Sequence, residues 1–123
     1  MSLTRIARRK SFQCLHQDGA CFTPSGPGHN FELEVFFEGT IDPVTGMVAN
    51  LVDIDALLGE LLVPIAGKRL NEEVAEFKNS AASTEAIAGF LSSRLLKINK
   101  MKGVRVAKLR LYEHDDLWVD VWP

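Results

Sequence analysis

The sequence predicts one α+β domain, covering residues 1–123, in which two antiparallel hairpins carry two helices on one face of a sheet. Three observations lead to this fold class. Apolar and polar residues alternate strictly over residues 31–38, apolar residues recur at helical spacing over residues 51–65 and 83–98, and two β-rich runs close the chain. The expected order is therefore ββααββ, and a length of 123 residues suits a single domain.

The first two strands are predicted from alternation. Residues 5–16 alternate weakly, whereas residues 31–38 alternate strictly, as expected of a strand with one buried face. One face of the first strand would carry Ile6, Arg8, Lys10, Phe12, Cys14 and His16. The run Gly39–Pro43 is expected to end the second strand, because glycine and proline are disfavoured in strands.

The first helix is predicted from the spacing of its apolar residues. We expect it to begin near Asp53, after a turn at Pro43–Gly46, and to end near Gly67. Pro64 in the last turn agrees with this end, because proline does not continue a helix. The apolar stripe would consist of Leu51, Ile54, Leu58, Leu61, Leu62 and Ile65.

The second helix is expected to begin at Ser83 or Thr84. Either hydroxyl can accept a hydrogen bond from the free backbone N–H groups of a first helical turn. Glu85 would lie in that turn, where the helix dipole favours a negative charge. The inner stripe would consist of Ile87, Phe90, Leu91, Leu95 and Ile98.

A β-hairpin is predicted at the end of the chain. The β-rich runs 104–114 and 117–122 flank Asp115 and Asp116, which suit a tight turn. An antiparallel pair at each end of the chain, with both helices between them in sequence, completes the α+β arrangement.

Composition excludes several classes of function. The formal net charge is −2 and the longest basic run is Arg8–Lys10, so nucleic acid is not an expected partner. No apolar run approaches the roughly 20 residues that cross a bilayer, and no signal peptide precedes the first strand. We therefore expect a cytoplasmic protein without a membrane partner. Cys14 and Cys21 form no CxxC pair, which favours reduced thiols.

Several segments, in order along the chain, resemble the 6-pyruvoyltetrahydropterin synthase and 6-carboxytetrahydropterin synthase family. They are Phe12–His16, Cys21 with Gly26–Phe31, Ile41–Leu51, Ser83–Glu85 and Tyr112–Glu113. The resemblance extends from Phe12 to Trp122. It implies the tunnelling fold, in which strands of different subunits join into a barrel, and a homo-oligomer that is a trimer or a dimer of trimers.

The resemblance also implies a chemistry. Family members act on 7,8-dihydroneopterin triphosphate and eliminate triphosphate, so the expected partner is a small-molecule pterin. Zinc held by three histidines binds the side-chain hydroxyls, and a cysteine acts with an Asp-His pair to move protons. A bound cation acidifies the hydroxyls that it touches, and a cysteine needs a neighbouring base or cation to be a useful thiolate.

Carried over residue by residue, the implied reaction centre is incomplete. His16 and His29 stand at two zinc positions, whereas Pro27 stands where the third histidine is expected. Ala66 and Gly67 occupy the positions of the Asp-His pair. Zinc is therefore a possible but doubtful cofactor. Cys21 matches the catalytic cysteine, although taken alone it is only a loop thiol.

The sequence offers one candidate to replace the missing zinc ligand. Cys14 lies two residues before His16 on the same predicted strand face, so its thiolate can replace the third histidine. Against this, the family usually has Ala or Ser there without coordination. Taken alone, His16 and His29 also fit ordinary structural histidines.

The substrate-binding residues implied by the resemblance are Glu113, Thr84 and Glu85. Glu113 matches the carboxylate that anchors the pterin ring, and its oxygens suit the paired N–H donors of that ring. Thr84 and Glu85 also fit a helix cap and a first-turn charge. Arg9 is expected on the strand face opposite Arg8, either in solvent or against substrate phosphates.

Three functions therefore remain open. The first is a family lyase, with the triphosphate elimination or an altered, aldolase-type cleavage of a pterin side chain. The second is a pterin-binding protein without chemistry. The third is an oligomeric barrel with a structural role. The losses at Pro27, Ala66 and Gly67 make the original elimination doubtful.

Overall fold

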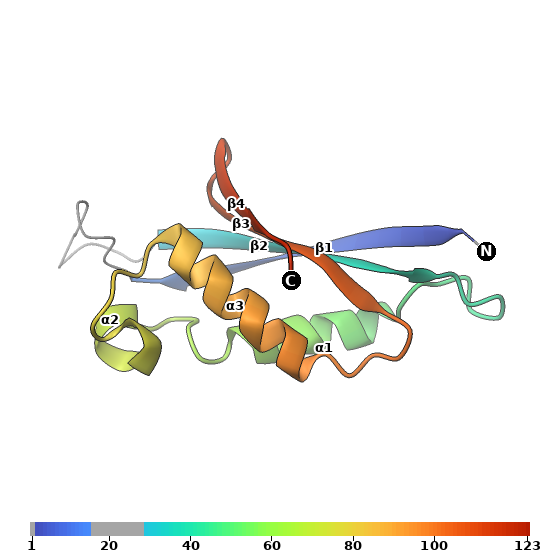
Figure 1. The fold of residues 1–123 in the computed structure, drawn as a ribbon, viewed down its shortest axis with the longest axis horizontal. Helices are drawn as coiled ribbons and strands as arrows, with labels where there is room; N and C mark the ends of the chain where they lie inside the picture. Colours follow the sequence, from blue (N-terminus) through green and yellow to red (C-terminus); the bar gives the residue numbers. More distant parts are fainter. Residues whose placement is uncertain (1, 16–28) are drawn as a thin grey trace.

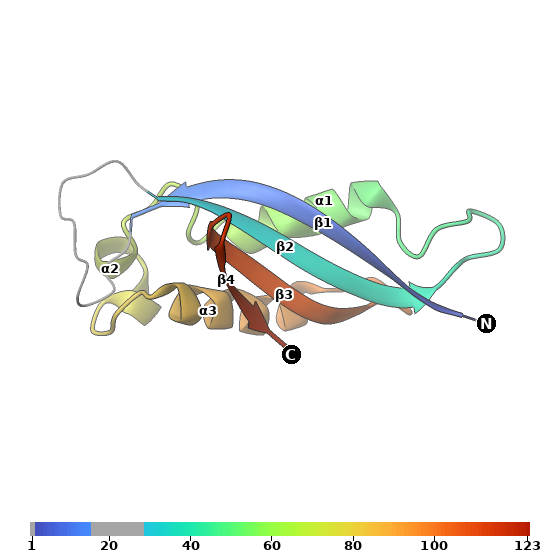
Figure 2. The same cartoon turned by 90° about the horizontal axis from the view of Figure 1, so that it is seen from above.

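A computed structural model describes residues 2–15 and 29–123 (Figures 1 and 2). The elements are β1 Leu3–Cys14, β2 His29–Thr40, α1 Leu51–Leu62, α2 Leu70–Glu73, the 3-10 helix η1 Ala75–Phe77, α3 Thr84–Ile98, β3 Arg105–His114 and β4 Leu117–Val121. The strands form one antiparallel sheet in the order β1-β2-β3-β4. Figure 1 shows α1 and α3 on the same side of this sheet, which confirms the predicted α+β arrangement.

The alternation in β2 determines which face of the sheet is buried. Phe31, Leu33, Val35 and Phe37 are each 0% exposed, and they lie on the face that the helices cover. Leu109 and Leu111 of β3 continue this face, and the apolar sides of α1 and α3 complete the core. The opposite face of the sheet, called here the open face, carries the intervening charged and aromatic side chains.

The strand register is regular between the first two strands and interrupted in the other pairs. β1 and β2 pair without a break from Leu3 opposite Thr40 to Cys14 opposite His29. The β2–β3 register shifts between Phe36 and Phe37. A second shift lies in β3, and it is described with the candidate site because it determines the position of Glu113.

The two long helices match the predictions except at the two ends of α1. α3 begins after Ser83, whose hydroxyl accepts from Ala86 N at 3.1 Å, as the sequence predicts. α1 begins at Leu51, two residues before Asp53, because Asn50 Oδ1 accepts from Val52 N at 2.8 Å. The regular part of α1 ends at Leu62, before the predicted stop.

Three residues assigned to apolar stripes, Leu51, Phe90 and Ile98, are less buried than predicted. Leu51 is 45% exposed because it lies in the first turn of α1, beyond the edge of the core. Phe90 is partly exposed on the flank of α3. α2 and η1 were not predicted, since they are too short to show a helical period. No helix in the described ranges is long and apolar enough to cross a membrane.

Candidate functional site

Glu113 occupies a β-bulge next to the turn of the last hairpin. Tyr112 pairs with Trp118 and His114 pairs with Leu117, so Glu113 has no residue directly opposite it in β4. A bulge of this kind inserts one residue and redirects the side chains around it. Glu113 follows the buried Leu109 and Leu111 at two-residue spacing, which places it at the end of the helix-facing row of β3.

A hydrogen bond joins this bulge to the first residue of α3. Thr84 Oγ1 donates to Glu113 Oε1 at 3.1 Å, and the Thr84 side chain is buried. The structure therefore brings together two of the three predicted substrate-binding residues. Glu85 is exposed in the first turn of α3, and it contributes a negative charge there without a described contact to Glu113.

A cavity of about 440 Å³ opens beside Glu113. It is lined by Ser11, Asn30, Phe31, Glu32, Tyr112, Glu113, His114 and Asp115. Its size falls within the usual range for a small-molecule site of roughly 300–1,000 Å³. Three of its lining residues are carboxylates, namely Glu32, Glu113 and Asp115. The cavity is consequently better suited to N–H donors than to a group with several negative charges.

Tyr112 holds a charged network on the open face, next to the cavity. Its hydroxyl accepts from Arg9 Nη2 at 2.9 Å and donates to Glu34 Oε1 at 3.0 Å. The guanidinium carbon of Arg9 lies 4.6 Å from the centroid of the Tyr112 ring, within cation–π range. Hydrogen bonding to Glu34 raises the pKa of Arg9. The predicted position of Arg9 on the face opposite Arg8 is confirmed, and its partners there are Glu32, Glu34 and Tyr112.

The same network continues across the sheet to β4. Arg110 forms a two-point contact with Asp120, with Nε–Oδ1 and Nη2–Oδ2 distances of 2.7 and 3.1 Å. This hydrogen bonding lowers the pKa of Asp120 and raises that of Arg110. Two-point contacts between a guanidinium and a carboxylate are stronger and more specific in geometry than neutral hydrogen bonds. The sequence signal for this network is the polar half of the strand alternation, because those residues face away from the helices.

The segment after α1 pairs with the end of β1. Leu15 N donates to Lys68 O at 3.0 Å, Leu70 N donates to Leu15 O at 2.9 Å, and Gly67 N donates to Gln13 O at 2.6 Å. Ala66 and Gly67, the positions at which the resemblance implies an Asp-His pair, therefore adjoin the end of β1. Gly67 has φ of +73°, a conformation that favours glycine, so a side chain at this position would be strained.

Cys14 lies in the hydrophobic core at the end of β1. Its side chain is 2% exposed, and this burial raises its pKa to about 12. The thiol is therefore protonated at neutral pH in the described structure. Its strand neighbour across the β1–β2 ladder is His29, one of the two predicted zinc ligands.

The remaining predicted reaction residues are not described. His16, Cys21 and Pro27 lie outside the described residues, and His29 is described only as a backbone position in β2. Among the side chains that the structure describes, which do not include that of His29, no three from His, Cys, Asp or Glu are grouped so as to hold a metal ion. The proposed zinc ligands thus stay a prediction from the sequence.

Comparisons with known proteins agree with this arrangement. A family described as "6-pyruvoyl tetrahydropterin synthase" matches residues 5–123. The 6-pyruvoyl tetrahydrobiopterin synthases of Pongo abelii and Homo sapiens are 33% and 32% identical over 127 positions, each alignment covering 91% of this chain and 86% of the relative. A putative 6-carboxy-5,6,7,8-tetrahydropterin synthase of Archaeoglobus fulgidus is 28% identical, covering 76% of this chain and 73% of the relative.

The fold of this chain also matches the folds of solved protein structures. The 6-pyruvoyl tetrahydropterin synthase of Caenorhabditis elegans superposes with a TM-score of 0.86 at 23% identity, covering 100% of this chain and 97% of the other. The Plasmodium vivax protein of the same name gives 0.71 at 15% identity, covering 98% of both chains. The match over residues 5–123, the identities above 30% and the shared fold show that the chain belongs to the 6-pyruvoyl tetrahydropterin synthase family.

Proposed function

We propose that this chain binds a dihydropterin, such as 7,8-dihydroneopterin triphosphate, with Glu113 as the anchor of the ring. The observation that carries this proposal is the placement of Glu113, held by Thr84 at the N-terminus of α3 and bordering a cavity of about 440 Å³. Family membership suggests the class of ligand and the residues, and the geometry of the site supports this choice.

The chemistry of a carboxylate suits the edge of a pterin ring. That edge presents neighbouring N–H donors, and a carboxylate accepts two such bonds in a fixed, planar geometry. Thr84 donates to one oxygen of Glu113 and so fixes the plane of the carboxylate. Because this contact restricts the Glu113 side chain before the ligand binds, the side chain loses less conformational entropy on binding.

The elimination of triphosphate is proposed to be weak or absent. Proton transfer needs an acid or base within hydrogen-bond reach of the reacting atoms. Ala66 and Gly67 carry no titratable side chain, and they stand where the family has its Asp-His pair, beside the end of β1. Cys21 then lacks the partner that would activate it.

The assembly is proposed to be a homotrimer or a dimer of trimers. β1 and β4 are the edge strands of the sheet, and β1 presents a long edge of 12 residues, Leu3–Cys14. An edge strand of this length readily pairs with another chain. Pairing of β1 with β4 of a neighbour would close a ring with the helices outside. Light scattering coupled to size-exclusion chromatography tests this, and a monomer would contradict it.

Fluorescence titration with 7,8-dihydroneopterin tests the role of Glu113. Glu113→Gln keeps the shape but removes the charge, so we expect affinity to fall about 10- to 100-fold, the range for a hydrogen bond to a charged group. Glu72→Gln, at an exposed position of α2, is the matched control and should bind like the parent. Equal binding by the parent and Glu113→Gln would contradict ring anchoring by this carboxylate.

A further inference from the structure

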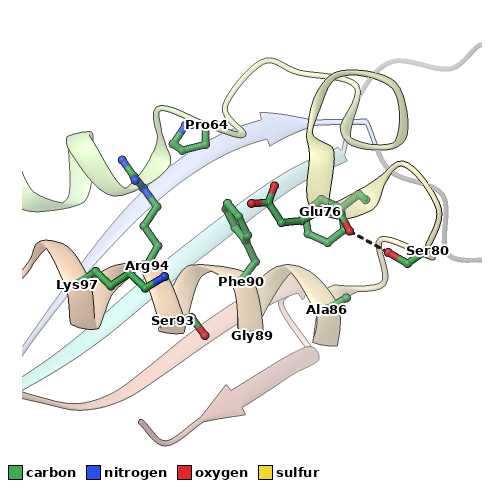
Figure 3. Close-up of a pocket in the computed structure, with 10 residues that line it drawn as sticks. Pro64, Glu76, Ser80, Ala86, Gly89, Phe90, Ser93, Arg94 and Lys97 are labelled. Atoms are coloured by element: carbon green, nitrogen blue, oxygen red, sulfur yellow. Dashed lines mark hydrogen bonds between the residues drawn. The ribbon is translucent and has the colours of Figure 1, made fainter.

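A second and larger cavity lies on the helical layer, away from the predicted pterin site. Its volume is about 640 Å³, and none of its described lining residues lines the cavity beside Glu113. α3 forms its floor, while the segment after α1 and η1 form its walls (Figure 3). The lining residues are Pro64, Glu76, Phe77, Ser80, Ala86, Gly89, Phe90, Ser93, Arg94 and Lys97.

Two aromatic side chains form an apolar wall in this helical-layer cavity. Phe90 of α3 and Phe77 of η1 are in contact, with ring centroids 5.6 Å apart and an interplanar angle of 59°. Phe77 is buried, whereas Phe90 is partly exposed and stands up from α3 into the cavity (Figure 3). A partly exposed phenyl ring, in a cavity that Pro64 also lines, offers a flat apolar surface to a planar ligand.

Gly89 leaves open space on the floor of this cavity. It lies in the interior of α3, where glycine weakens a helix relative to alanine. A Cβ at Gly89 would meet nothing within 4 Å, so no contact within the described chain explains the missing side chain. The backbone of α3 is therefore accessible to a ligand beside Phe90.

The charges in the cavity are separated. In Figure 3, Arg94 lies to one side of Phe90 and Glu76 to the other. Arg94 donates to Leu61 O and Glu60 O, at 3.2 and 2.9 Å, which fixes the guanidinium without neutralising it. Among the residues that the structure describes, neither Arg94 nor Lys97 forms an ion pair with a carboxylate. Two cations thus stand at one end of an aromatic wall.

We propose that the helical-layer cavity is a binding site for a small planar aromatic molecule that carries an anionic group, a carboxylate or a phosphate. The ring would lie against Phe90 above Gly89, and the anion would lie between Arg94 and Lys97. Glu76 and Ser80, at the other end, would accept N–H or O–H donors on the ring. This site is separate from the proposed pterin site and does not depend on it.

Calorimetry with matched probes tests the ligand chemistry on the full chain. We expect 2-naphthoate and 2-naphthyl phosphate to bind, and their relative affinities distinguish a carboxylate site from a phosphate site. Neutral 2-naphthamide and non-aromatic cyclohexanecarboxylate should each bind at least about fivefold more weakly. Absence of binding by both aromatic anions, or equal binding by the neutral amide, would overturn the proposal.

Matched variants locate the binding. Gly89→Leu fills the floor and Lys97→Glu reverses a charge, so each should weaken binding of 2-naphthoate at least about fivefold. Gly59→Leu in α1 and Lys100→Glu after α3 are the controls, since neither lines the cavity, and their affinities should stay within about twofold of the parent. If Gly89→Leu fails to fold, the affinity of Lys97→Glu still tests the proposal, because Lys97 is exposed and its substitution should not disturb the fold. Unchanged affinity in Lys97→Glu would place the ligand elsewhere and refute the site.

Discussion

The Thr84 hydroxyl donates a 3.1 Å hydrogen bond to Glu113 Oε1, joining the first residue of α3 to the bulge of β3. The contact links two segments 29 residues apart in sequence. It orients the carboxylate that we propose as the pterin anchor, and it holds the N-terminus of α3 against the end of the sheet. Substitutions at Thr84 therefore have consequences for both stability and binding.

Thr84→Val removes the donor while keeping the shape of the side chain. We expect it to destabilise the fold by about 1 kcal/mol or more, since it leaves a partly buried carboxylate short of one partner. Thr84→Ser retains the hydroxyl and should destabilise the fold less than Thr84→Val. Thermal unfolding at fixed protein concentration measures the loss, and fluorescence titration measures pterin affinity. A Val variant that binds pterin as tightly as the Ser variant would disprove the orienting role.

Glu38 is predicted to make stability dependent on acid pH. Hydrogen bonding from Arg5, at 2.6 Å, and from Arg105 lowers the pKa of Glu38 from the ordinary value of 4.5. Because the folded-state pKa is the lower one, this stabilisation is present above pH 4.5 and is lost as the pH falls through the folded-state value.

Glu38→Gln should therefore be less stable than the parent at pH 7, and the difference should shrink as the pH falls below 4.5. Urea denaturation at pH 7, 5 and 3.5 measures this. Glu72→Gln, at an exposed position of α2, serves as the control for the loss of a surface carboxylate. A difference between Glu38→Gln and the parent that stays constant with pH would count against the two arginine contacts.

Cys14 is expected to be unreactive in the folded protein. Burial raises its pKa to about 12, and the side chain is 2% exposed, so neither the thiolate nor access is available at pH 8. In a Cys21→Ser background, a thiol-specific chromogenic reagent should therefore label Cys14 only after denaturation. Stoichiometric labelling of native protein within minutes would show that the end of β1 opens readily.

The metal content of the purified protein should be low. Of the three zinc positions that the resemblance implies, two are histidines, His16 and His29, and the third is Pro27, which has no ligand atom in its side chain. We expect well under one zinc per chain by elemental analysis, and a higher content in Pro27→His. One zinc per chain in the parent that disappears in Cys14→Ser would instead establish Cys14 as the third ligand.

Two glycines should respond oppositely to substitution by alanine. A Cβ at Gly59, inside α1, meets nothing within 4 Å, so Gly59→Ala should stabilise the protein by about 0.5–1 kcal/mol. A Cβ at Gly39 would lie 2.8 Å from the carbonyl oxygen of Gly103, so Gly39→Ala should destabilise it. Denaturant midpoints measure both changes, and equal signs would contradict the packing of β2 against the loop at Gly103.

The strands and α3 were predictable because local chemistry determines them. Strict alternation in β2 reflects one buried face, and Ser83 marks the start of α3 by its capping hydroxyl. α1 begins two residues before the predicted start because the side chain of Asn50 caps it. The short α2 was missed because four residues show no period.

The site was less accessible from the sequence. Resemblance identified Glu113 and Thr84, but their contact depends on a register shift in β3, and alternation alone does not reveal a bulge. The proximity of Gly67 to Gln13 depends on a backbone hydrogen bond between segments far apart in the sequence, which no local pattern predicts. The helical-layer cavity was hidden because Phe90 fits the spacing of an inner stripe, although it lies at the edge of that stripe.

Equilibrium dialysis against 7,8-dihydroneopterin triphosphate tests the central claim most directly, because bound pterin and free triphosphate can be quantified in one mixture. We predict saturable binding of about one pterin per chain, weakened by Glu113→Gln, with little triphosphate released over hours. Rapid, catalytic release of triphosphate would contradict the proposed loss of the elimination reaction, and absence of bound pterin would contradict the proposed binding function.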